Sequence, residues 1–127
     1  MRVLVVRHCE AAAGSPDDLR PLTPEGREAA AALGAELAGE RPDAIVCSPL
    51  LRARETAGAI AEACGLQAEV DERLGPGASL DGLRAATAGR GELVVAVGHQ
   101  PDCGEIVEAA TGRTVEFPPG GRAELGL

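Results

Sequence analysis

Residues 2–8 of the chain read Arg-Val-Leu-Val-Val-Arg-His, in which four consecutive apolar residues are followed by a basic pair. A short, β-branched apolar run of this kind predicts a strand over residues 2–6 that is buried on both faces. Such a strand lies in the middle of a layered protein, with helices on both sides. The residue His8 is therefore expected at the carboxyl end of a central strand.

Outward from this strand, the chain alternates between strands and helices. Helices are predicted to begin at Thr23-Pro24 and at Ser48-Pro49, where an N-cap residue precedes a proline. Shorter helices are predicted over 79–88 and 101–110, and further strands over 43–47, 67–70, 92–97 and 122–126. This alternation predicts an α/β fold, a three-layer α/β/α sandwich with a mostly parallel central sheet. The length of 127 residues fits a single domain, residues 1–127.

The composition excludes several classes of function. All twelve basic residues are arginine, so a Walker-type phosphate loop and Schiff-base chemistry are both excluded. The net charge of −8 argues against binding to nucleic acid or to an anionic membrane. The aromatic residue Phe117 has no aromatic companion, so no platform for stacking bases exists.

The sequence also favours a cytoplasmic location for the protein. No stretch approaches the roughly 20 apolar residues of a membrane span, and the N-terminus does not resemble a signal peptide. The four cysteines form no CxxC pair, which is typical of reduced thiols in a cytosol. We therefore expect a cytoplasmic protein, monomeric, without a membrane or nucleic-acid partner.

The chain has two histidines, and each follows the apolar run of a predicted strand. His8 follows the first strand, and His99 follows the strand over 92–97. Ligands of open α/β sheets bind at this carboxyl edge. Arg7 beside His8, and Arg52 in the first turn after Ser48-Pro49, add two guanidinium groups that suit a phosphoryl group. Because a neutral imidazole can attack phosphorus directly, these residues predict phosphoryl transfer through a histidine.

Four motifs in this order resemble those of the histidine phosphatase superfamily, and the short layout is similar to its SixA-type phosphohistidine phosphatase branch. They are Arg7-His8-Cys9-Glu10, Leu22-Thr23-Pro24-Glu25-Gly26, Ser48-Pro49-Leu50-Leu51-Arg52-Ala53-Arg54-Glu55-Thr56 and Gly98-His99-Gln100-Pro101. The resemblance implies the phosphoglycerate mutase-like form of the α/β/α sandwich. It also implies a phosphatase that works without a metal or other cofactor, through a phosphorylated histidine.

The resemblance assigns roles to individual residues. His8 matches the nucleophile, and Arg7, Arg52 and His99 match the other residues of the phosphate pocket. Arg20 matches an arginine near the mouth of the pocket in the SixA branch. Cys9 stands where the family usually has glycine or another small residue, and a thiol beside the nucleophile raises the question of sensitivity to oxidants.

The sequence shows no clear general acid. Asp71, Glu72 and Asp81 follow the second long helix, none within a motif, and Glu72 is the substrate-binding residue that could act as an acid. Without one, an alkoxide leaves badly, whereas an imidazole leaves readily because its conjugate acid has a pKa near ~6.5. We therefore expect phosphohistidine in a protein, such as a histidine-phosphorylated signalling protein, as the substrate.

Other functions stay open on the sequence alone. A broad-specificity phosphomonoesterase of the same superfamily would depend on Glu72, and a catalytically silent phosphate-binding module would keep the pocket without turnover. A zinc site formed by the histidines with Cys9, Cys47 and Cys103 lacks the spacing of metal ligands. A cysteine phosphatase would need arginine after five intervening residues, and Cys47 has arginine after four and after six.

Overall fold

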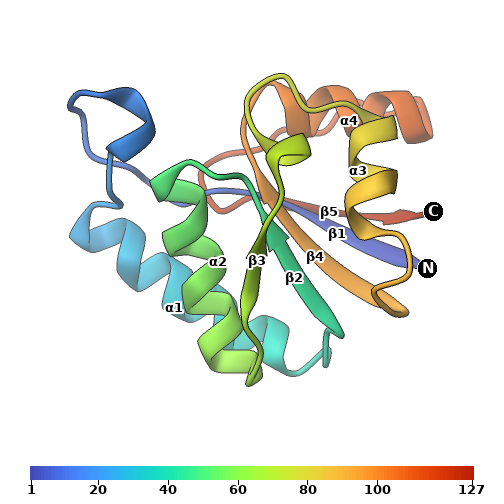
Figure 1. Cartoon of the computed structure of the whole chain (residues 1–127), viewed down its shortest axis with the longest axis horizontal. Helices are drawn as coiled ribbons and strands as arrows, with labels where there is room; N and C mark the ends of the chain where they lie inside the picture. The colour runs from blue at the N-terminus through green and yellow to red at the C-terminus, as the bar shows by residue number, and fades with distance from the viewer.

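The computed structural model describes all 127 residues and arranges them in three layers (Figure 1). The central sheet has the strand order β3-β2-β4-β1-β5, in which β5 is antiparallel to β1 and all other neighbours are parallel. The strands are β1 (Arg2–Arg7), β2 (Ala44–Cys47), β3 (Ala68–Val70), β4 (Leu93–Gly98) and β5 (Arg122–Gly126). The predicted α/β/α sandwich is confirmed.

Two helices cover each face of the sheet. One face carries α1 (Pro24–Ala38) and α2 (Leu51–Cys64), and the other carries α3 (Leu80–Thr87) and α4 (Asp102–Thr111). Two short 3-10 helices, η1 (Asp17–Leu19) and η2 (Glu72–Leu74), lie in the loops after β1 and β3. None of the helices combines the length and apolar character that a membrane crossing requires.

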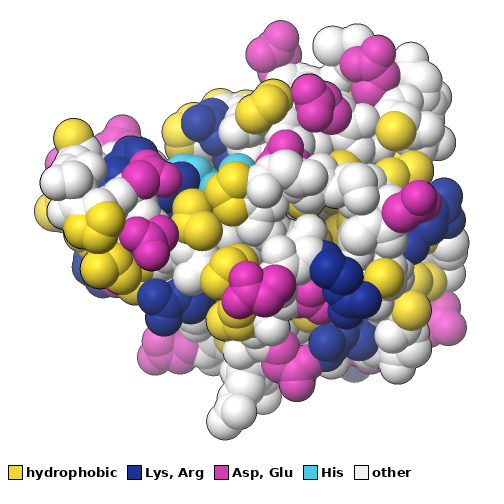
Figure 2. All heavy atoms as spheres, turned by 45° about the horizontal axis from the view of Figure 1, so that its top comes forward, with side chains coloured by type: hydrophobic (Ala, Val, Ile, Leu, Met, Phe, Trp, Pro, Cys, Tyr) yellow, Lys and Arg dark blue, Asp and Glu magenta, His cyan; other side chains and the backbone are white.

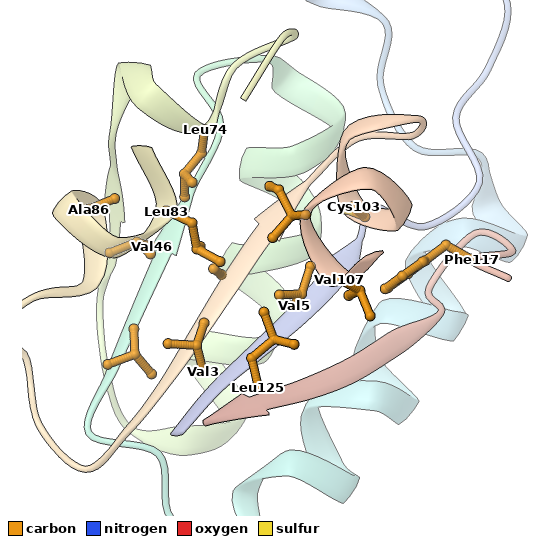
Figure 3. Close-up of a cluster of buried hydrophobic side chains, with 13 residues drawn as sticks. Val3, Val5, Val46, Leu74, Leu83, Ala86, Cys103, Val107, Phe117 and Leu125 are labelled. Atoms are coloured by element: carbon orange, nitrogen blue, oxygen red, sulfur yellow. The ribbon is translucent and has the colours of Figure 1, made fainter. Parts of the chain in front are cut away.

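The alternation of side chains along β1 explains why both faces need helices. Val3 and Val5 pack with residues of α3 and α4, and Figure 3 shows them beside Leu83 and Val107. The residues between them, Leu4 and Val6, pack against α1 and α2 instead. Because a strand turns successive side chains to opposite faces, the continuous apolar run supplies both halves of the core.

The predicted ends of the helices are mostly confirmed, with one exception. The Thr23 hydroxyl caps α1 by accepting from the Gly26 amide at 2.9 Å, and Ser79 caps α3 through the Gly82 amide. The prediction that Ser48-Pro49 begins a helix is wrong, since α2 begins at Leu51 and Ser48 does not cap it. The Ser48 hydroxyl instead lies beside the side chain of His99, which is distant in the sequence.

The topology brings three chain segments to one edge of the sheet. The strands β2, β4 and β1 are consecutive neighbours, and their parallel register pairs Cys47 with Val97 and Arg7 with Gly98. Each of these strands ends at the same level, so the residues that follow them lie together. His8, Ser48 and His99 are those residues.

The position of Gly26 in the fold explains why the Leu22–Gly26 motif ends in glycine. It lies in the first turn of α1, against the loop that follows His8, and a Cβ atom there would lie 2.1 Å from the Glu10 carbonyl oxygen. We expect Gly26→Ala to lower the free energy of unfolding by about 2 kcal/mol or more, because backbone must move. Urea unfolding measures this.

Gly58 in α2 provides the matched control. A Cβ atom at Gly58 would meet no atom within 4 Å. Gly58→Ala should therefore raise the free energy of unfolding by about 0.5–1 kcal/mol through helix propensity. Equal effects at the two glycines would contradict the close approach of Gly26 to the loop.

Candidate active site

His8 lies at the centre of the site, at the carboxyl end of β1, and is 9% exposed. Its Nδ1 atom lies 2.7 Å from the Cys9 carbonyl oxygen, which can only accept a hydrogen bond. Nδ1 therefore carries the proton in the neutral ring, and Nε2 keeps its lone pair. Figure 2 shows histidine side chains at the surface of this edge, with arginine beside them.

The environment of His8 favours the neutral ring. Burial is the largest influence and lowers the pKa of His8 below its ordinary value, while the hydrogen bond to Cys9 opposes this shift. The positive charges of Arg52, Arg7 and Arg20 lower the pKa further. At neutral pH the ring is therefore uncharged and nucleophilic at Nε2.

His99 follows β4 and packs against His8, with 5.3 Å between the ring centroids and 59° between the ring planes. Its Nε2 atom lies 2.7 Å from the Ser48 hydroxyl. Burial lowers the pKa of His99 to about 4, and the charges of Arg52 and Arg7, with that of His8 when its ring is protonated, act in the same direction. This ring is therefore also neutral at pH 7.

The arginines predicted from the sequence lie around the two rings. Arg7 donates to the Phe117 carbonyl oxygen at 2.9 Å, and Arg20 donates from Nε to the Ala12 carbonyl oxygen at 2.8 Å. Arg52, the second residue of α2, has a side chain that is only 10% exposed. These residues surround His8 closely enough to lower its pKa, so the structure brings His8, His99, Arg7, Arg20 and Arg52 together.

Two buried nitrogens in this group have no hydrogen-bond partner within the protein. They are Nε of Arg7 and Nδ1 of His99, and no other buried side-chain nitrogen or oxygen lacks a partner. Buried polar atoms are nearly always hydrogen-bonded in proteins. Their occurrence on these two residues alone is what a site for an external hydrogen-bonding group, such as an oxyanion, requires.

Besides Ser48, two residues whose role the sequence did not indicate hold the site together. Thr56 is fully buried, and its hydroxyl accepts from the Cys9 amide at 3.0 Å and donates to the Arg52 carbonyl oxygen at 2.9 Å. Asp17 accepts hydrogen bonds from both Arg20 and Arg52 with its carboxylate. Thr56 belongs to the motif over residues 48–56, whereas nothing in the sequence indicates the partners of Asp17.

Asp17 places a negative charge between two arginines that an anion would use. Its carboxylate lies 2.9 Å from Arg20 and 3.2 Å from Arg52, and its carbonyl oxygen accepts from Arg52 at 2.8 Å. Hydrogen bonding to Arg20 and the charge of Arg52 lower the pKa of Asp17. The carboxylate is therefore ionised and competes with any bound anion.

We expect Asp17→Asn to tighten binding of inorganic phosphate about two- to threefold at low salt, because one opposing charge is removed from the site. Isothermal titration calorimetry measures the affinity. Asp18→Asn, an exposed neighbour with no hydrogen bond to an arginine, is the matched control. Weaker binding by Asp17→Asn would mean that the carboxylate mainly positions the arginines.

The carboxylates considered as acids lie apart from these contacts. Glu72 begins η2 and is exposed, and its side chain forms no hydrogen bond or ion pair. Asp71 is bound to Arg73, with Oδ2 at 2.8 Å from the guanidinium, and Asp81 lies in the first turn of α3. The role of Glu72 as an acid stays a prediction.

Three of the four cysteines are buried, and burial disfavours their thiolate forms. Cys9 is 1% exposed, and burial raises the pKa of its thiol, which disfavours the reactive thiolate. Burial likewise raises the pKa of Cys47 to about 11 and that of Cys103 to about 12. The histidines, cysteines and carboxylates form no group of three placed to hold a metal ion.

The two buried histidines make stability depend on pH. Both pKa values lie below the unfolded value near ~6.5, so the unfolded chain binds more protons as the pH falls. The free energy of unfolding should therefore be constant between pH 8 and 7 and decrease as the pH falls from about 6.5 towards 4. Urea unfolding at stepped pH measures it, and a flat profile from pH 7 to 5 would contradict the burial of both rings.

Fold and site together define a class: α/β/α proteins with a histidine-and-arginine anion site at the carboxyl edge of the sheet. Within this class, the chain belongs to the histidine phosphatase superfamily (branch 1), whose family model matches residues 3–76. The match spans His8, Arg20 and Arg52, whereas His99, which the sequence also predicted, lies beyond it. The superfamily identified from the motifs is confirmed.

The resemblance to the SixA branch is also confirmed by solved structures. The protein histidine phosphatase SixA complexed with tungstate is 28% identical, with a TM-score of 0.88, over 100% of this chain and 88% of that chain. A putative phosphohistidine phosphatase SixA from Agrobacterium tumefaciens is also 28% identical, with a TM-score of 0.82, over 97% of this chain and 89% of that chain.

Two further proteins are similar to this chain, one in its fold and one in its sequence. A mycobacterial glucosyl-3-phosphoglycerate phosphatase shares the fold, with 20% identity and a TM-score of 0.77 over 98% of this chain and 90% of that chain. An uncharacterised protein of Picosynechococcus sp. is 42% identical over an alignment of 106 positions that covers 77% of this chain. The chain spans 64% of the length of that relative.

Proposed function

We propose that this chain is a phosphatase that transfers a phosphoryl group first to His8 and then to water. The observation that carries the proposal is the state of His8, a neutral ring whose Nδ1–H is bound to the Cys9 carbonyl oxygen. Its free Nε2 lone pair lies among arginine side chains and a second imidazole, where a phosphoryl group would be both bound and attacked.

The reaction has two steps. In the first, His8 Nε2 forms a bond to phosphorus, and the bond from phosphorus to the leaving group breaks with its electron pair. In the second, a water oxygen attacks phosphorus, the electron pair of the broken bond returns to Nε2, and inorganic phosphate is released with both hydrogens of the water. Arg7, Arg52 and His99 stabilise the charge on the phosphoryl oxygens in both steps.

We propose phosphohistidine in a protein as the substrate. A leaving imidazole takes up a proton readily, because its conjugate acid has a pKa near ~6.5, whereas an alkoxide needs a strong proton donor. The carboxylate that contacts the arginines of the site is Asp17, and its lowered pKa keeps it ionised. The similarity to the protein histidine phosphatase SixA supports the same class of substrate.

The test compares two substrates after treatment of the protein with EDTA. We expect faster phosphate release from a histidine-phosphorylated carrier protein than from an aryl phosphate ester, with no loss of rate on metal removal. Faster release from the ester would favour the broad-specificity phosphomonoesterase. No release from either substrate, with phosphate binding intact, would favour the silent phosphate-binding module.

Glu72 distinguishes the two enzymatic outcomes. If it supplies a proton to an alkoxide, Glu72→Gln should slow ester cleavage by tenfold or more while leaving phosphohistidine cleavage unchanged. We expect both rates to stay within twofold of the unmodified chain, because the side chain is exposed and forms no hydrogen bond or ion pair with a residue of the site.

A further inference from the structure

Ser48 carries a buried hydroxyl whose role the sequence did not reveal. It follows β2 directly and is fully buried. Its oxygen accepts a hydrogen bond from the Leu50 amide at 3.2 Å and lies 2.7 Å from Nε2 of His99. The hydroxyl is thus fixed from both sides, and the position of its own proton decides which nitrogen of His99 is protonated.

Counting donors and acceptors leaves one consistent arrangement. If His99 Nε2 carried the proton, it would donate to the Ser48 oxygen, which already accepts from Leu50, and the hydroxyl proton would be buried without an acceptor. If Ser48 instead donates to Nε2, the hydroxyl satisfies both of its bonds. The ring proton of neutral His99 then resides on Nδ1.

We propose that Ser48 is a positioning residue that holds His99 as the Nδ1–H tautomer, so that the second histidine donates a hydrogen bond to the phosphoryl oxygen. The Nδ1 atom of His99 is one of the two buried nitrogens that have no partner within the protein. With the proton on Nε2, Nδ1 would present a lone pair to an oxyanion and repel it.

A protonated histidine would donate from either nitrogen and would need no such control. Burial holds the pKa of His99 at about 4, so the ring has a single N–H at neutral pH. The arrangement therefore supplies a donor without adding a full positive charge beside Arg7, Arg52 and His8. Ser48 therefore determines which nitrogen of this neutral ring carries the single proton.

Nitrogen-15 spectra of the imidazoles test the tautomer directly, because the chain contains only two histidines. In the protein at pH 7, we expect His99 to show a protonated Nδ1 and an unprotonated Nε2. Spectra of His8→Asn assign the remaining signals to His99. Protonation at Nε2 of His99 would overturn the proposal, and no Ser48 variant has to fold for this result.

Ser48→Ala should then move His99 towards the Nε2–H tautomer, and Ser48→Thr should restore the original pattern. Thr87→Val, which removes a buried hydroxyl bound to the Leu83 carbonyl oxygen in α3, is the control for lost stability alone. We expect Thr87→Val to leave the His99 signals unchanged. An unchanged pattern in Ser48→Ala would overturn the role of Ser48.

The catalytic consequence rests on the proposed function. Ser48→Ala should lower kcat for phosphate release by about tenfold or more, and Ser48→Thr should recover most of the loss. A structural role would lower stability without changing the tautomer, and Thr87→Val shows that case. If the chain released no phosphate at all, the proposed function would fail while the spectra would still decide the tautomer.

Discussion

Replacing His8 with asparagine is expected to lower phosphate release by at least about a thousandfold, because no other group can supply the nucleophile. The asparagine amide can still donate to the Cys9 carbonyl oxygen, as Nδ1 of His8 does at 2.7 Å, so the loop should keep its conformation. Phosphate release from a histidine-phosphorylated protein measures the effect, with thermal unfolding as the check on the fold.

A second readout separates nucleophilic catalysis from simple binding. Rapid quenching of the unmodified chain with a labelled substrate should trap a phosphoryl group that is labile in acid and attached to His8. The His8→Asn chain should show no such label while still binding inorganic phosphate through its arginines. Turnover by His8→Asn within tenfold of the unmodified chain would rule out the covalent mechanism.

The framework of the site was predictable because it depends on local patterns. The apolar run before His8 and the similar run before His99 are strand signals, and parallel strands with helical connections must end at one edge of the sheet. The cap at Thr23 is equally local, since the hydroxyl bonds an amide three residues away. These local features are enough to predict that both histidines and Arg52 lie together.

The remaining parts depend on partners that are distant in the chain. Ser48 has the local pattern of a helix cap, but its hydroxyl lies against a ring 51 residues away. Thr56 binds the Cys9 amide across 47 residues, and Asp17 reaches Arg52 across 35. A single sequence carries no signal for such pairs, and the competition of a tertiary partner with a local cap is what made the predicted start of α2 wrong.

Arginine side chains alone supply the positive charge near the two histidines. The chain has no lysine, so every positive side chain near the histidines is a guanidinium group, which binds through a planar set of donors. Arg52 already donates through one terminal nitrogen to the Asp17 carbonyl oxygen and through the other to the Asp17 carboxylate. The nitrogens have further N–H groups, so one side chain can bind residue 17 and a phosphoryl oxygen together.

Arg52→Lys should therefore lower kcat/KM for phosphate release by about a hundredfold, although it conserves the charge. A single ammonium group cannot hold the η1 loop and span two phosphoryl oxygens at once. Steady-state kinetics with a histidine-phosphorylated protein measures the effect. Arg54→Lys is the matched control, because Arg54 lies on the same turn, is exposed, and donates only to the Pro49 carbonyl oxygen. We expect this control to stay within twofold, and a threefold or smaller loss in Arg52→Lys would mean that charge alone, not the fork, holds the phosphoryl group.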